Sequence, residues 1–314
     1  MVSIKVSAAG KPIALARGLP MVVELSGKQL EDATVADVKS AIAKKYPGFY
    51  FDRQKITLKD SKNTLDDDIT LKVAGVAEGG ELSVKDLGPQ MSWKTIFLVE
   101  YAGPLFIHPV IYYFPEIFYG GPVQHSMLQR YVLAFVMLHF AKRELETLFV
   151  HRFSHATMPF MNIFKNSAHY HLGSGLALAY SVYSPVYGAA SPYIRGTVRN
   201  DPLYIQAGAA IWLFSEISNL ITHIKLRNLR PAGSRKRAIP QGYGFNLVSV
   251  PNYFFEFLGW LVIATLTGSY AAWIFLVIAT YQMYVWAVKK HRAYRKEFGS
   301  DYPRDRKAMF PFIA

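Results

Sequence analysis

Residues 245–288 read FNLVSVPNYFFEFLGWLVIATLTGSYAAWIFLVIATYQMYVWAV, a long and almost uninterrupted apolar stretch. A single helix of this length would extend about 66 Å, roughly twice the thickness of a bilayer core. The Gly268-Ser269 pair near its middle supplies the break that a turn requires. The stretch therefore predicts a helical hairpin, with one membrane span over 245–267 and a second over 270–288.

Working outward from this hairpin, the chain shows further apolar segments of membrane-spanning character. They lie at 93–114, 127–141, 168–187 and 203–224. Hydrophobic residues make up 51% of the chain and charged residues 18%, below the roughly 25% of soluble domains. We therefore expect residues 88–314 to form a multi-span α-helical membrane bundle of about six helices.

The distribution of charge supports this arrangement. Residues 1–90 hold 13 Lys/Arg and 12 Asp/Glu, whereas residues 91–314 hold 22 and 10. Six spans place the basic segments 142–165, 225–237 and 289–314 on one side, together with the N-terminal region, and the positive-inside rule makes that side cytosolic. This pattern argues against intrinsic disorder and against a soluble nucleic-acid binder. The chain has no Cys, which excludes disulfides and thiolate chemistry.

Residues 1–87 have the pattern of a small soluble α+β domain. Residues 2–6 alternate as a half-buried strand does, residues 21–25 form a second strand, and short strands follow at 55–58 and 82–87. Thr34 and Asp37 have the spacing of a capping box that opens a helix. This order of elements resembles the ubiquitin-like β-grasp fold.

Polar and ionisable residues lie within or beside the predicted spans, where burial is costly and a functional role is the default hypothesis. They are Glu100, His139, Lys142, Glu144, Glu146, Glu216, Asn219, His223, Asn252, Tyr253 and Glu256. The basic segments 226–237 and 291–298 interleave Arg with aromatic and Asn residues, which favours a nucleotide over bare lipid headgroups. No GxGxxG motif follows a strand, so a Rossmann site is not indicated.

The histidines deserve a separate test for metal binding. His151 and His155 form an HxxxH pair, and His169 and His171 form an HxH pair. Membrane di-iron hydroxylases use such boxes, but with HxxHH motifs and about eight ligands, whereas this chain has nine His in total and no HxxHH. We therefore expect no metal site.

Several motifs now coincide with those of one family. The block KRELETLFVHRFSHATMP at 142–159 with NIFKN at 162–166 resembles the signature of very-long-chain trans-2-enoyl-CoA reductases. So do LRNLRPAGS at 226–234, PNYFFE at 251–256 and the tail, which carries HRAY at 291–294, DYP at 301–303 and PF at 311–312. The N-terminal ubiquitin-like domain also fits this family, and the bundle is more distantly similar to steroid 5α-reductases.

The resemblance implies an endoplasmic-reticulum membrane enzyme that uses NADPH for the last, reducing step of fatty-acid elongation, with an acyl-CoA substrate and neighbouring elongation enzymes as partners. It also implies a role in sphingolipid metabolism. By matching motifs, Lys142 and Tyr253 are the expected catalytic pair, and Glu100 matches a substrate-side carboxylate. The expected cofactor-side residues are Asn219, Arg227, Arg230, Asn252, Glu256, His291, Tyr294 and Arg295.

One departure from the steroid reductases bears on the chemistry. Where those enzymes carry a catalytic Tyr after the second span, this chain has Glu144. The proton donor must then differ, which raises the weight on Tyr253, with Lys142 as the cation that tunes it or as a phosphate ligand. Three alternatives stay open: a reductase of a steroid or polyprenol enone, a membrane methyltransferase, and a non-catalytic adaptor that presents a ubiquitin-like domain.

Overall fold

The computed structural model describes residues 2–153, 156–229 and 238–313; Arg230 and His155, both singled out from the sequence, lie outside the described residues. The chain forms two compact units. One comprises Met1–Ser92 with His155–Asn162, and the other Trp93–Ser154 with Ile163–Ala314. Each unit is described by itself.

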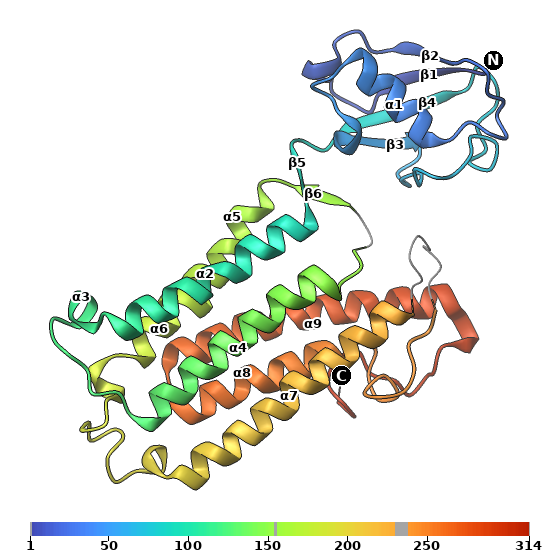
Figure 1. Ribbon diagram of the computed structural model, residues 1–314. Coiled ribbons are helices and arrows are strands. Elements are labelled where there is room, and N and C mark those ends of the chain that lie inside the picture. The colour runs from blue at the N-terminus through green and yellow to red at the C-terminus, as the bar shows by residue number, and fades with distance from the viewer. Residues whose placement is uncertain (1, 154–155, 230–237, 314) are drawn as a thin grey trace. The chain divides into compact units, whose positions relative to one another are not determined.

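The first unit is built on a four-stranded sheet in the order β2-β1-β4-β3 (Figure 1). Its strands are β1 (Val2–Ala8), β2 (Met21–Leu25), β3 (Gln54–Leu58) and β4 (Glu81–Asp86). β1 runs antiparallel to β2 and parallel to β4, while β3 runs antiparallel to β4. The strands predicted from period-two alternation are confirmed, and their order around one helix is that of a β-grasp domain.

The helix of this unit, α1 (Val35–Lys45), begins where the capping box predicts. The Thr34 hydroxyl accepts from the Asp37 amide at 3.3 Å, and the Thr34 amide donates to the Asp37 carboxylate at 2.8 Å. Val35, Val38 and Ile42 lie on one face and are fully buried against the sheet. A short ladder between β5 (Gln90–Ser92) and β6 (Thr157–Pro159) also belongs to this unit.

The second unit is helical. Its elements are α2 (Trp93–Tyr113), α3 (Pro115–Tyr119), α4 (Met127–Phe149), α5 (Asn162–Ser167), a π-helical stretch (Ala168–Ala177), α6 (Leu178–Val182), α7 (Pro202–Asn228), α8 (Pro251–Thr267) and α9 (Tyr270–Phe298). All six predicted apolar segments are helical over most of their length. The predicted break is confirmed, because Gly268 adopts a left-handed conformation with φ 64° and Ser269 caps α9.

Two boundaries differ from the sequence prediction. Helix α8 begins at Pro251 rather than at residue 245, because the residue before a proline disfavours the helical conformation and Val250 is accordingly not helical. Residues 245–250 instead form a loop that follows Gly244, whose φ is 74°. Helix α4 continues to Phe149, beyond the predicted end at 141, and carries its charged residues inside the bundle.

Among the described residues, two helices are long and apolar enough to cross a membrane: Trp93–Tyr113 and Tyr270–Asp301. Helix α8 has only 17 residues, and α4 and α7 carry several charged side chains, so the crossing of a membrane by these helices stays a prediction. The apolar core between the helices is rich in aromatic side chains, including Tyr101, Phe140, Tyr183 and Trp260. This core surrounds a group of charged residues.

Candidate active site

Three helices of the bundle, α4, α7 and α8, lie side by side and carry polar side chains at helical spacing (Figure 1). Residues three, four or seven apart share one face of a helix, so each helix presents a polar stripe. The stripes consist of His139, Lys142, Arg143 and Glu146 on α4, Glu216, Asn219 and His223 on α7, and Asn252 and Glu256 on α8. We call these nine residues the buried polar cluster.

His139 links all three helices. Its Nδ1 lies 2.9 Å from Glu216 Oε1 and its Nε2 lies 3.2 Å from Glu256 Oε1. An imidazole satisfies a carboxylate on each nitrogen only when both nitrogens carry a proton. The geometry therefore fits a positively charged ring between two carboxylates.

Lys142 is held on the α7 side of the same cluster. Its ammonium lies 2.7 Å from Glu216 Oε2 and donates to Asn219 Oδ1 at 2.7 Å. The amide of Asn219 in turn donates to the Asn252 carbonyl at 2.8 Å and to Glu256 at 3.2 Å. The structure thus joins Lys142, Asn219, Asn252 and Glu256, all predicted site residues, in one hydrogen-bonded network.

Arg143 forms a second centre one residue further along α4. It contacts Glu146 Oε2 at 2.6 Å and donates to the Tyr101 hydroxyl at 2.9 Å. His223 Nδ1 lies 3.0 Å from Glu146 Oε1. Arg143, Lys142 and a charged His139 balance Glu146, Glu216 and Glu256, so that the cluster holds three ions of each sign, all buried or partly buried. Such balance is what makes buried charge tolerable.

Glu100, the predicted substrate-side carboxylate, and Glu144, a further predicted catalytic candidate, lie apart from these ion pairs. Glu100 is buried on α2, and its carboxylate is hydrogen-bonded to the Asn166 side chain. One oxygen of Glu100 and one of Glu144 are buried without a hydrogen-bond partner among the described residues. Buried acceptors without partners are rare, and they mark places where a ligand group with an N–H or O–H is able to bind.

A possible metal-binding group occurs beside Arg143. Ligand atoms of Glu146, His151 and His223 lie within 4.8 Å of one another. The Glu146 carboxylate already pairs with Arg143 and His223, which places a guanidinium against any added cation. Burial lowers the pKa of His151 to about 3, so this ring is neutral at physiological pH. The expectation of no metal site stays a prediction.

Tyr253 lies on α8 beside the buried polar cluster but on another face. Its ring packs 6.4 Å from that of Trp286 on α9. The charges that act on its hydroxyl are those of Arg143 and Glu256. Lys142, the cation that the sequence analysis assigned to Tyr253, contacts Glu216 and Asn219 instead, which makes Arg143 a second candidate for that role.

The C-terminal tail contacts Ser249, in the loop that precedes α8. The Ser249 hydroxyl lies 2.6 Å from His291 Nδ1 and 2.6 Å from the Tyr302 hydroxyl. Tyr294 stacks on Tyr302 with ring centroids 5.7 Å apart. The Ser249 amide donates to the Lys307 carbonyl at 2.8 Å. The tail therefore brings His291 and Tyr294, two predicted cofactor-side residues, to the loop that precedes Asn252.

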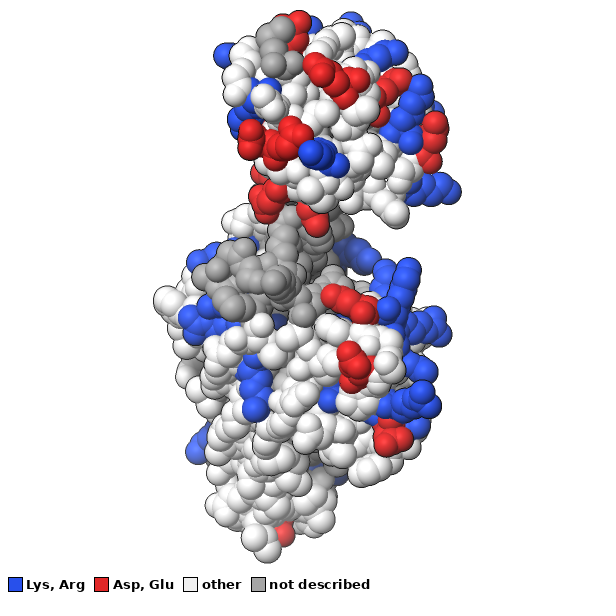
Figure 2. Space-filling view, turned by 90° about the vertical axis from the view of Figure 1, so that its right-hand side faces the viewer, with Lys and Arg blue, Asp and Glu red and all other residues white. Residues whose placement is uncertain are grey.

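Exposed basic residues occupy the ends of α7 and α9. Arg227 lies in the last turn of α7, and Arg292, Arg295 and Lys296 lie near the end of α9. On the face of the bundle that Figure 2 shows, Lys and Arg gather toward one end, while the other end carries almost no charge. Arg230, a further predicted phosphate ligand, lies outside the described residues.

Sequence reasoning missed three participants: Arg143, Tyr101 and Ser249. Arg143 has a detectable signal, because it precedes Glu146 by three residues on the same helical face as His139. Tyr101 reads as an ordinary apolar-face aromatic, and Ser249 as a loop residue. Only the fold reveals that they contact Arg143 and His291.

The candidate site contains groups of the kind that bind a dinucleotide. Asn252 Oδ1 is buried without a partner among the described residues, which leaves an acceptor for a carboxamide or ring amine. Arg227 and Arg295 supply exposed cations of the kind that bind phosphates. The residues present therefore fit such a group.

Two family matches agree with this fold and site. Residues 156–314 match the 3-oxo-5-alpha-steroid 4-dehydrogenase family, and residues 23–86 match the family described as TECR, ubiquitin-like domain. These matches and the apolar helices indicate a membrane-associated reductase that uses a nicotinamide cofactor.

Similar proteins of known name refine the class. A very-long-chain enoyl-CoA reductase of Dictyostelium discoideum is 45% identical over 248 residues, which cover 79% of this chain and 78% of that protein. A Schizosaccharomyces pombe protein described as an enoyl reductase is 54% identical over 250 residues, or 80% of this chain and 82% of that one. A human trans-2,3-enoyl-CoA reductase-like protein is 31% identical over 295 residues, which cover 91% of this chain and 78% of that protein. The chain belongs to the very-long-chain enoyl-CoA reductases of the steroid dehydrogenase family, which confirms the predicted resemblance.

Proposed function

We propose that this protein reduces the trans-2 double bond of long- and very-long-chain enoyl-CoA thioesters to the saturated acyl-CoA, with NADPH as reductant, as the last step of fatty-acid elongation. The observation that carries the proposal is a charge-balanced, buried polar cluster beside Tyr253, in a chain whose relatives are named enoyl-CoA reductases. The same reaction would serve sphingolipid metabolism wherever a trans-2-enoyl-CoA arises.

The reaction needs a hydride at the β carbon, a proton at the α carbon and stabilisation of the thioester oxygen. NADPH supplies the hydride when it is bound. We assign the proton, or a hydrogen bond to the developing enolate, to the Tyr253 hydroxyl. A tyrosine is a weak donor unless a cation assists it, and we assign that assistance to Arg143, whose charge acts on Tyr253 against the opposing charge of Glu256.

Lys142 has a related role in this proposal. Through Asn219 it fixes the α7 side of the site, and it neutralises Glu216 beside His139. Glu100 and Glu144 each have a buried acceptor oxygen without a partner among the described residues, and we assign these oxygens to the substrate side. The proposed cofactor contacts come from Asn219, Arg227, Arg230, Asn252, Glu256, His291, Tyr294 and Arg295.

The proposed setting follows from topology. Six spans within residues 88–314 place the basic segments, the ubiquitin-like domain of residues 1–87 and the C-terminal tail on the cytosolic side of the endoplasmic-reticulum membrane. Because acyl-CoA and NADPH are charged, an entrance on that side serves both. The ubiquitin-like domain is the proposed docking module for other elongation enzymes.

The decisive experiment measures NADPH oxidation by detergent-purified protein with a long-chain trans-2-enoyl-CoA. Tyr253→Phe is expected to lower kcat by about 100-fold or more while NADPH still binds, because a general acid contributes that much. Tyr270→Phe is the matched control, since Tyr270 is an exposed tyrosine at the start of α9.

The two parts of the proposal fail separately. Normal turnover by Tyr253→Phe would remove Tyr253 from the chemistry. Absence of NADPH oxidation by the wild type with the thioester, but activity on a steroid enone, would assign the enzyme to the other branch of the family.

A further inference from the structure

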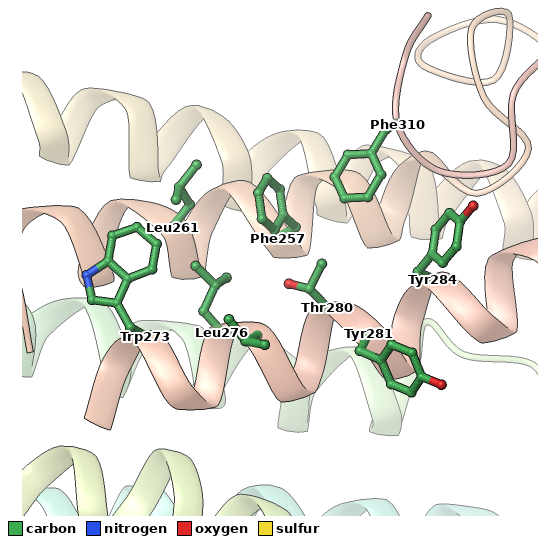
Figure 3. Close-up of a pocket in the computed structure, with 9 residues that line it drawn as sticks. Phe257, Leu261, Trp273, Leu276, Thr280, Tyr281, Tyr284 and Phe310 are labelled. Carbon is green, nitrogen blue, oxygen red and sulfur yellow. The ribbon is translucent and has the colours of Figure 1, made fainter. Parts of the chain in front are cut away.

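An apolar groove lies between α8 and α9 and has no part in the reaction as described so far (Figure 3). Its volume is about 500 Å³. Phe257 and Leu261 line it from α8, Leu276 and Thr280 line it from α9, and all nine lining residues are uncharged. An uncharged lining excludes a phosphate or a CoA moiety and suits a hydrocarbon.

The α8 wall of the groove lies on the helix face that also carries the candidate catalytic residue, Tyr253. Tyr253, Phe257 and Leu261 are spaced by four residues, so they form one stripe on one face of α8. Tyr253 packs into the same apolar cluster as Phe257 and Tyr284. From Tyr253 to Leu261 the stripe extends about 12 Å along the helix.

The C-terminal tail shapes the end of the groove that lies near Tyr253. Phe310 packs edge-on against Phe257, with ring centroids 5.3 Å apart, and lies 6.4 Å from Tyr284. Figure 3 shows the Phe310 ring over this end of the groove, while Trp273 and Leu261 lie at the other end. A hydrocarbon chain in the groove would therefore have one end beside Tyr253.

From this continuity we infer that the groove binds the acyl chain of the enoyl-CoA substrate, with the double bond next to Tyr253 and the distal methylenes between α8 and α9. The inference rests on the proposed function and adds the place where chain length is sensed. We assign the groove to the substrate's own chain because its lining is continuous with the apolar cluster that contains Tyr253, where the double bond would react.

Two neighbouring residues on α9 provide a matched test. Val277 lines the groove and Ile278 does not, although both are exposed, at 62% and 54%. Val277 lies seven residues from Tyr284, about 10 Å along α9 from the head of the groove. The full-length purified protein carries either Val277→Trp or Ile278→Trp, and kcat/KM is measured with trans-2-hexadecenoyl-CoA and trans-2-hexenoyl-CoA.

We expect Val277→Trp to lower kcat/KM for the hexadecenoyl substrate about tenfold or more, because several methylenes lose their apolar contact. The hexenoyl substrate, which is too short to reach Val277, keeps its wild-type value, and Ile278→Trp changes neither. Equal kcat/KM ratios for Val277→Trp and wild type would overturn the inference. A wild type that reduces neither substrate would instead refute the proposed function.

A second measurement covers a general loss of activity in Val277→Trp. A saturated acyl-CoA with a diazirine near its methyl end is photo-crosslinked to the wild-type protein, and the labelled peptides are mapped. Labels on residues 273–284, reduced by excess unlabelled acyl-CoA, support the inference. Labels on Phe257 or Leu261 of α8, the facing wall of the groove, would support it equally. Labels confined to helices other than α8 and α9, or labelling that excess acyl-CoA does not reduce, would overturn the inference.

Discussion

The two units of the chain differ in how deeply their ion pairs are buried. In the ubiquitin-like unit, Lys72 pairs with Glu31, and their side chains are 64% and 51% exposed. In the helical unit, Glu146 pairs with Arg143 and Glu216 pairs with Lys142. The side chains of the two glutamates are only 1% and 8% exposed. Exposed pairs contribute little to stability, and buried pairs commonly cost more in desolvation than they return. The ion pairs of the helical unit therefore have a larger desolvation cost than this exposed pair of the ubiquitin-like unit.

The cores show the same contrast. The ubiquitin-like core consists of side chains such as Ile4, Ile56 and Leu82, all fully buried, and stability follows from their packing. The bundle surrounds a charged cluster with aromatic rings, including Phe140 and Trp260, which pack on His139. The difference is that the ubiquitin-like core consists of apolar side chains alone, whereas the helical unit combines an apolar core with a polar cluster, and this contrast can be tested.

The largest effect is expected where a buried charge loses its partner. Glu146→Leu leaves Arg143 buried without its carboxylate, and breaking such a pair costs about 3–5 kcal/mol. We expect the melting temperature of the purified protein to fall by roughly 10 °C. The measurement is thermal unfolding in detergent, followed by fluorescence.

The double variant Arg143→Met/Glu146→Leu distinguishes stability from chemistry. Replacing both partners by apolar groups removes the uncompensated charge, so the melting temperature should return toward that of the wild type while reductase activity stays low. If the double variant recovered full activity, Arg143 would have no role beside Tyr253.

A smaller effect, confined to one unit, is expected in the ubiquitin-like core. Ile56→Ala removes a fully buried side chain of β3 and should destabilise that unit by about 2–5 kcal/mol. Limited proteolysis of the full chain should then cleave within residues 1–87 much faster, while reductase activity persists. Val22→Ala, at an exposed position of β2, serves as the control. Loss of activity in step with cleavage would show that the two units are not separable.

Much of the fold was predictable from local patterns. The strands of the first unit, the capping box at Thr34 and Asp37, and the break at Gly268 each depend on neighbouring residues, and each is confirmed. The start of α8 was wrongly placed, because the apolar pattern continues through residues 245–250 while Pro251 fixes the boundary. A hydropathy pattern does not record this backbone constraint.

The site was predictable by residue type but not by pairing. Periodicity places Lys142 and Glu146 on one face of α4, yet it does not tell which helix that face meets. The contact of Lys142 with Glu216 and Asn219 joins residues more than seventy positions apart. The link between Ser249, His291 and Tyr302 has no local signature at all. These pairings come from helix packing, which a single sequence does not specify.

The smallest predicted effect concerns a partly buried ion pair of the ubiquitin-like unit, Arg53 with Asp86. The Arg53 guanidinium donates two hydrogen bonds to the Asp86 carboxylate, of 2.9 and 2.6 Å. The Gly88 amide donates to the same carboxylate at 2.8 Å. Partial burial opposes the charged form, but these hydrogen bonds outweigh it and lower the pKa of Asp86 below its ordinary value. A lowered folded-state pKa stabilises the unit above the unfolded value of about 4, and this contribution is lost as the pH falls through the folded-state pKa.

Asp86→Asn should therefore cost about 1 kcal/mol or less at neutral pH, and its difference from wild type should shrink as the pH falls below the unfolded-state pKa of about 4. The measurement is amide hydrogen exchange of β3 and β4 in the full chain, taken as the ratio of variant to wild type at each pH, because intrinsic exchange then cancels. Glu24→Gln, an exposed change of equal charge on β2, is the control. A ratio that stays constant with pH would mean that Asp86 owes its effect to shape rather than charge. In that case, of the ion pairs tested, only those of the helical unit would contribute measurably to stability through their charge.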